Sequence, residues 1–179
     1  MISKETKKFI ALTLTVLMSI TILTSCGGQK SPSSSADPQK TESQVLSKEE
    51  YVDKVKSSSN EISEISNKYS ADMQSSDTNT AADATTAFVN EIRPIYEELA
   101  ALNAPKEFSS QQGKIKKGCE ASLEILDLSV ELIELGRGDI QGKEEEIAEK
   151  VTQINSKMSE LMDQAQDMTS AINEVVTAA

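Results

Sequence analysis

The chain has 179 residues and a net charge of −11, with 29 acidic against 18 basic side chains and neither histidine nor tryptophan. Acidity of this size argues against nucleic-acid binding, which needs a basic surface. The missing histidines remove the commonest general acid–base group and the commonest metal ligand. We therefore expect no nucleic-acid partner, no metal site and no catalytic residues.

The first 26 residues have the layout of a secretory signal. Lys4, Lys7 and Lys8 precede an apolar run over residues 9–23, and Ser25 and Cys26 follow it. Signal peptides place a basic segment, an apolar segment and a small-residue cleavage site in this order. The run covers 15 residues, three of them threonine and one serine, whereas a membrane-spanning helix needs about 20 apolar residues. We therefore expect a cleaved signal peptide over residues 1–25 rather than a permanent transmembrane helix.

The segment Leu23-Thr24-Ser25-Cys26 resembles the lipobox of bacterial lipoproteins. The resemblance implies cleavage between Ser25 and Cys26 and a diacylglyceryl group, carrying fatty acyl chains such as palmitate, on the Cys26 thiol. Two acyl chains on one residue make a stable anchor, because one chain alone binds a bilayer only reversibly. We therefore expect the protein on the extracytoplasmic face of the cell membrane, with lipid at Cys26 as its only added group.

Residues 26–44 predict a flexible tether. After Cys26 they are rich in serine, proline, glycine and charged side chains, a composition that buries too little apolar surface to fold. A coil of this length has a root-mean-square reach of roughly 25 Å. Cleavage at Cys26 would remove three lysines and one glutamate and leave a net charge of −13. A bundle this acidic is expected to stand away from anionic lipid head groups.

Two helices are predicted in the next part of the chain. Ser47 and Glu50 have the spacing of a capping box, flanked by an apolar pair at Leu46 and Tyr51, and start a helix over about 48–73. A polar loop over 75–79 leads to a second helix over about 80–102. Pro94 lies inside that helix and is expected to kink it, because proline lacks the backbone N–H.

A third helix is predicted over about 105–135, with Pro105 at its first position. Glycine at 136 is expected to end it, and Asp139 to cap a fourth helix over about 140–177. The apolar side chains of the third helix form a wide stripe, which predicts contact with more than one neighbour. The main line of the stripe is Phe108, Ile115, Cys119, Leu123, Leu126, Val130 and Ile133.

The fourth helix has the clearest pattern of the chain. Its apolar residues recur at alternating spacings of four and three, as in a coiled-coil seam. The seam is Ile147, Val151, Ile154, Met158, Leu161, Ala165, Met168, Ile172 and Val175. Four amphipathic helices with short connections predict an all-α, up-down-up-down four-helix bundle over residues 45–179. The alternative is a pair of long hairpins that dimerise through the seam of the fourth helix.

Cys119 is the only cysteine that remains after lipidation of Cys26, so the chain has no pair for an internal disulfide. A single cysteine on an apolar helix face is typical of a small core residue. A reactive thiol, the first alternative, would need an exposed and cationic setting. An intermolecular bridge is the second alternative.

Three other features have a structural and a functional interpretation. Arg137-Gly138-Asp139 matches the short motif of integrin ligands, but a helix stop followed by a cap explains the same residues. The carboxylates at 144–146 and 149 suit a solvated helix start, and a bundle di-metal site would also need inward-facing histidines. Arg93 and Lys106 bracket the turn between the second and third helices, where a proline-bent junction can open a small pocket or form a plain turn.

We expect a non-catalytic lipoprotein whose helical bundle binds a protein or another envelope component. Lipobox, serine-rich spacer and bundle resemble, in layout, the small helical cell-envelope lipoproteins of Gram-positive bacteria, a resemblance that implies no defined activity. The alternative is an extracytoplasmic small-ligand sensor or transporter accessory that acts through a membrane partner. An enzyme is the third hypothesis, and no nucleophile–base pair or phosphate-binding loop is recognisable in the sequence. The sequence names neither the partner nor ligand-binding residues.

Overall fold

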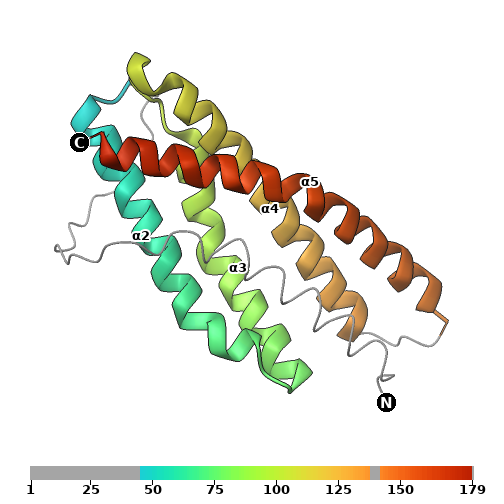
Figure 1. Cartoon of the computed structure of the whole chain (residues 1–179). Coiled ribbons are helices and arrows are strands. Elements are labelled where there is room, and N and C mark those ends of the chain that lie inside the picture. Colours follow the sequence, from blue (N-terminus) through green and yellow to red (C-terminus); the bar gives the residue numbers. More distant parts are fainter. Residues whose placement is uncertain (1–44, 138–141, 179) are drawn as a thin grey trace.

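The computed structural model describes residues 45–137 and 142–178. Within them the chain forms four α-helices and no strand: α2 (Lys48–Met73), α3 (Thr78–Ala101), α4 (Ser109–Arg137) and α5 (Glu144–Thr177). A short 3-10 helix, η2 (Lys106–Phe108), precedes α4. Successive helices alternate in direction (Figure 1). The expected all-α, up-down-up-down bundle is therefore confirmed, whereas the expected signal peptide and most of the tether lie outside the described residues.

The helices approach one another to different extents. The α4–α5 interface is the largest, α2–α3 and α3–α4 are intermediate, and α2–α5 is smaller than these three. Figure 1 shows α2 and α5 converging where α2 begins and α5 ends, and diverging away from that point. We call this the closed end of the bundle; α3 also ends there and α4 begins there. The opposite end, where α2 ends and α5 begins, is the open end.

The predicted start of α2 is confirmed. Ser47 Oγ accepts a hydrogen bond from the backbone N–H of Glu50 at 3.2 Å, and the Glu50 carboxylate accepts one from the backbone N–H of Ser47 at 3.0 Å. This reciprocal pair is a capping box, which satisfies two N–H groups that a helix start leaves unpaired. Local sequence chemistry is therefore enough to place this helix.

The start of α3 differs from the prediction by two residues. Asp77 Oδ1 accepts a hydrogen bond from the backbone N–H of Asn79 at 2.9 Å, so Asp77 is the cap and the helix begins at Thr78. Thr78 and Asn79, which the sequence assigned to the loop, are therefore helical. Further on, α3 continues without interruption through the exposed Pro94, and the kink stays a prediction.

The predicted boundaries of the last two helices need correction. Pro105 precedes the 3-10 turn η2, so α4 begins only at Ser109 and ends at Arg137. The next helix begins at Glu144, with Lys143 at its N-cap and no capping side chain. Gly142 has a φ of +86°, a conformation that a helix cannot pass through and that glycine adopts readily. The expected cap at Asp139 is therefore wrong, and Asp139 itself lies outside the described residues.

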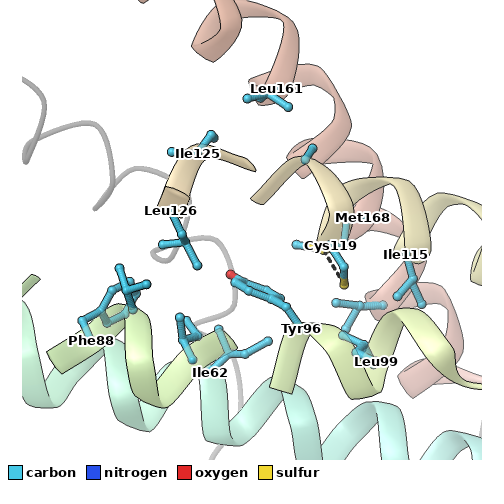
Figure 2. Close-up of a cluster of buried hydrophobic side chains, with 14 of the residues drawn as sticks. Ile62, Phe88, Tyr96, Leu99, Ile115, Cys119, Ile125, Leu126, Leu161 and Met168 are labelled. Atoms are coloured by element: carbon cyan, nitrogen blue, oxygen red, sulfur yellow. Dashed lines mark hydrogen bonds between the residues drawn. The ribbon is translucent and has the colours of Figure 1, made fainter. Parts of the chain in front are cut away.

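The core fills the space between the four helices. Every seam residue of α5 whose side chain is described is buried, which confirms the heptad prediction and places the seam inside the bundle. Figure 2 shows side chains of this core, among them Tyr96, Leu99, Ile115, Cys119 and Met168. The alternative in which two chains dimerise through this seam is therefore excluded, because the seam is already covered within one chain.

The predicted stripe of α4 is confirmed at Ile115, Cys119, Leu126 and Ile133, which are buried, but not at two of its members. Leu123 and Val130 are only half-buried, whereas Ser122 and Ser129 are almost fully buried. Each serine hydroxyl donates to the backbone carbonyl four residues earlier, at 2.8 Å. A hydroxyl that is hydrogen-bonded within its own helix costs little to bury. These two small polar residues can therefore lie on the buried face of α4.

Candidate functional site

The residues that carry the strongest sequence prediction, Ser25 and Cys26, lie outside the described residues. Neither their cleavage nor their lipidation is therefore tested by the fold. Among residues 45–137 and 142–178, no helix has the length and the hydropathy that crossing a membrane requires.

Cys119 is a core residue, as predicted. Its side chain is fully buried, and its Sγ lies 3.7 Å from the Sδ of Met168 on α5 (Figure 2). Burial, with a smaller contribution from Glu120, raises the pKa of the Cys119 thiol to about 12. A reactive cysteine needs the opposite, a lowered pKa and access to solvent. Cys119 is therefore neither a nucleophile nor accessible to a second chain.

Polar groups at the closed end are bonded to one another. The Tyr51 hydroxyl donates to Oε1 of Gln112 at 2.8 Å, and Nε2 of Gln112 donates to the carbonyls of Leu99 at 3.0 Å and Ala100 at 3.3 Å. Those carbonyls belong to the last turn of α3, where a helix leaves its acceptors unpaired. Gln112 thus connects α2, α3 and α4, and burial raises the pKa of Tyr51 to about 12.

The turn between α3 and α4 does not bring Arg93 and Lys106 together. Arg93 forms an ion pair with Asp127 of α4 at 2.5 Å, and Lys106 is exposed. Phe108 is buried and stacks on Tyr51, with ring centroids 5.4 Å apart. The aromatic side chains near this turn therefore fill the core, and this end of the bundle is closed by packing.

The other sequence-predicted features are located only in part. Arg137 forms an ion pair with Asp83 of α3, whereas Gly138 and Asp139 lie outside the described residues. In the first turns of α5, Glu145, Glu146 and Glu149 are exposed to solvent. No cluster of three or more potential metal ligands occurs in the described part of the chain.

A hollow that the sequence did not predict lies between α4 and α5. It has a volume of about 330 Å³. Its walls are Lys117, Glu120, Ala121 and Glu124 of α4 and Lys157, Leu161 and Gln164 of α5. Lys157 forms an ion pair with Glu124 across it. The hollow is mostly walled by long charged side chains that contact water, so it is a solvated notch rather than an apolar pocket.

The hollow lies beside a close contact between α4 and α5. A Cβ atom added at Gly118 of α4 would overlap the Cβ of Met168 and come within 3.0 Å of the carbonyl oxygen of Gln164. Glycine therefore permits the α4–α5 crossing. A glycine inside a helical pattern is a sequence signal for such a contact, but the sequence does not say which helix approaches.

Ion pairs at the surface of the bundle join the helices across three of the four helix–helix interfaces described above. Lys68 and Lys54 of α2 pair with Glu91 and Glu98 of α3. The pairs between α3 and α4 are Arg93–Asp127 and Arg137–Asp83, and those between α4 and α5 are Lys150–Glu131 and Lys157–Glu124. The described residues show no ion pair between α2 and α5.

Comparison of the chain with protein-family models, with curated proteins and with solved structures found no match.

Proposed function

We propose that this protein is a lipid-anchored extracytoplasmic lipoprotein whose bundle binds a protein or another envelope component and performs no chemistry. One observation carries the proposal: Leu23-Thr24-Ser25-Cys26 follows a basic segment and an apolar run at the start of the chain. The segments of a signal peptide follow one another in this order, and Cys26 is the residue that would receive the lipid.

The interior of the bundle supports a role in binding rather than catalysis. The buried hydroxyls of Ser66, Thr85, Ser122, Ser129 and Thr169 all donate to backbone carbonyls of their own helices. The Cys119 thiol is insulated by packing. Side chains bonded in this way stabilise the fold and are not free to act on a substrate, so an interaction would use the outer surface.

Replacement of Cys26 by alanine tests the anchor. We expect the wild-type chain in the membrane fraction of cells and the Cys26→Ala variant to lose acyl labelling and leave that fraction. Cys119→Ala is the matched control, because Cys119 is buried in the core and its loss should leave anchoring unchanged. Retention of Cys26→Ala in the membrane would contradict the lipid anchor and point to the apolar run at 9–23 as the anchor.

Cross-linking in intact cells, followed by purification of the full chain, tests the binding role. A protein or envelope polymer recovered in stoichiometric amount would support an interaction module. Turnover of an envelope polymer by the purified chain would contradict it.

The hollow between α4 and α5 is the observation that favours the second candidate, a small-ligand sensor or transporter accessory. Its 330 Å³ would hold a ligand of amino-acid size. A small molecule retained by the purified chain and lost on Gln164→Trp, which would fill the hollow from a half-buried position outside the seam, would favour this candidate over protein binding.

A further inference from the structure

The described chain enters the bundle at the closed end, where α2 begins (Figure 1). Val45, the first described residue, is 58% exposed. The next residue, Leu46, packs against the core, and its backbone N–H donates to the carbonyl of Asn103 at 3.0 Å. The capping box of Ser47 and Glu50 follows at once. The path of the chain is therefore fixed from Leu46 onward, and an anchor upstream of Val45 must hold the bundle by its closed end.

The bundle is longer than the reach of the tether predicted from the sequence. α5 has 34 residues, so the bundle is about 50 Å long at 1.5 Å per residue. Residues 27–44 would have a root-mean-square reach of roughly 25 Å as a coil and a span of about 60 Å at full extension. With the open end pointing at the membrane, the closed end would lie about 50 Å above it. That inverted orientation needs a tether close to full extension, which costs most of its conformational entropy.

The charge of the protein disfavours a bundle that lies flat on anionic lipids. The net charge is −11, and every helix carries exposed carboxylates, among them Glu61 of α2, Glu97 of α3, Asp127 of α4 and Asp163 of α5. A bundle lying on its side would place one such flank within a Debye length of the head groups, about 8 Å at physiological ionic strength. A bundle standing on one end keeps most of its charge beyond that distance.

We propose that the bundle stands upright on the membrane, with its closed end toward the lipid surface and its open end away from it. The proposal rests on the lipid anchor of the proposed function and adds which end of the bundle that anchor holds. The surface facing the lipid consists of the first turn of α2, the turn between α3 and α4, and the last turn of α5. The end of α2 and the starts of α3 and α5 then form the surface that a component farther out in the envelope meets first.

Energy transfer from the protein to the lipid surface tests the orientation. The full chain, purified from membranes, is reconstituted in vesicles of phosphatidylethanolamine and phosphatidylglycerol that carry an acceptor dye on their head groups. A donor dye is attached to one introduced cysteine in each variant. Matched pairs lie at the two ends of one helix, Ser110→Cys and Glu134→Cys in α4, and Lys48→Cys and Asp72→Cys in α2, all at exposed positions.

In both helices the closed-end position should transfer more energy than the open-end position, by at least about twofold, because the two differ by some 35–40 Å in height. Equal transfer from the two ends of either helix, or stronger transfer from the open end, would overturn the proposal. Failure of the anchor gives a different result. An unacylated chain would not float with the vesicles and would transfer energy from no position, which contradicts the proposed function. Cys119 is buried and takes no dye, and circular dichroism checks that each variant is folded.

Lipid charge and salt test why the bundle stands upright. In vesicles of phosphatidylcholine, which has no net charge, or in about 1 M salt, where the Debye length falls to about 3 Å, a flat bundle is no longer repelled. The difference in transfer between the two ends should therefore be smaller there than on anionic vesicles at low salt. A difference that is smaller on the anionic vesicles would mean that the bundle is drawn flat onto anionic lipids, and would overturn the proposal.

Discussion

The two ends of the bundle are stabilised by different interactions. At the closed end, Tyr51 stacks on Phe108, Gln112 connects three helices, and the backbone N–H of Leu46 donates to the carbonyl of Asn103 at 3.0 Å. At the open end, α5 begins without a capping side chain, and an exposed ion pair, Arg137–Asp83, joins α4 to α3. Apolar side chains are buried at both ends, among them Met73 and Ile133 at the open end. The difference is in the polar contacts, which are buried at the closed end and solvated at the open end.

This difference has a consequence for stability. Buried hydrogen bonds and aromatic contacts are little affected by salt, whereas exposed ion pairs contribute about 0–1 kcal/mol each and are screened at physiological ionic strength. Local opening should therefore begin at the open end. The seam still anchors that half of α5 on α4, and the largest predicted effect concerns the seam.

Leu161→Asp should destabilise the protein more than any other single change considered. Leu161 is 5% exposed in the seam of α5, and an unpaired buried charge costs about 3–5 kcal/mol. Chemical denaturation followed by circular dichroism would measure the change in the free energy of unfolding. Gln153→Asp, at an exposed position of the same helix, is the control and should change it by less than about 0.5 kcal/mol. Equal effects of the two would mean that this half of α5 is not packed on α4.

At the closed end, Gln112→Leu should cost about 2–3 kcal/mol, because it leaves the buried Tyr51 hydroxyl and two α3 carbonyls without their partner. The adjacent Gln111→Leu is a matched control. Gln111 bonds only the exposed Glu174, and its own buried Oε1 has no hydrogen-bond partner, so its loss should be nearly neutral. Equal unfolding free energies for the two variants in urea would show that Gln112 does not organise this end.

How far the sequence predicts the fold depends on whether the signal is local. The start of α2 follows from two residues three apart, and the seam of α5 from a repeat within one helix. The start of α5 was misplaced, because the φ of +86° at Gly142 is a feature of the folded turn. Ser122 and Ser129 were not in the predicted stripe of the third helix, yet both are buried, because each hydroxyl is hydrogen-bonded within its own helix.

The candidate sites likewise divide into those with a local sequence signal and those without one. The core position of Cys119 was predicted from its helix face and is confirmed. The hollow between α4 and α5 was not predicted, because its position depends on which helices pack against each other. The lipobox at Cys26 is a local signal of high specificity, and it stays a prediction until anchoring is measured.

Two glycines of α4, Gly118 and Gly113, test how closely α4 packs against α5 between the two ends of the bundle. Gly118→Ala should cost about 1–2 kcal/mol, since overpacking at Met168 and Gln164 outweighs the gain in helix propensity. A Cβ at Gly113 would meet nothing within 4 Å, so Gly113→Ala should stabilise the protein by about 0.5–1 kcal/mol. Thermal unfolding of both variants shows directly whether each substitution raises or lowers the stability of the protein. Stabilisation by both would mean that α4 and α5 are not in close contact at Gly118.

The smallest predicted effect concerns an exposed ion pair and depends on pH. Lys68 Nζ and the Tyr69 hydroxyl donate to the Glu91 carboxylate at 2.7 and 2.5 Å, and these bonds hold the pKa of Glu91 below its usual value near 4.5. Because the pKa is lower in the folded state, the stabilisation is present above the unfolded pKa and is lost as the pH falls through the folded one. Glu91→Gln should therefore lower the melting temperature slightly at pH 7, with a difference from wild type that shrinks on acidification and disappears below the lowered pKa of Glu91. Glu64→Gln removes an exposed α2 carboxylate that has no ion pair in the described residues and should leave the melting temperature unchanged. A difference for Glu91→Gln that persisted unchanged at every pH at which the protein stays folded would assign its effect to packing rather than to charge, as a part of the contact that Tyr69 of α2 makes with Phe88 of α3.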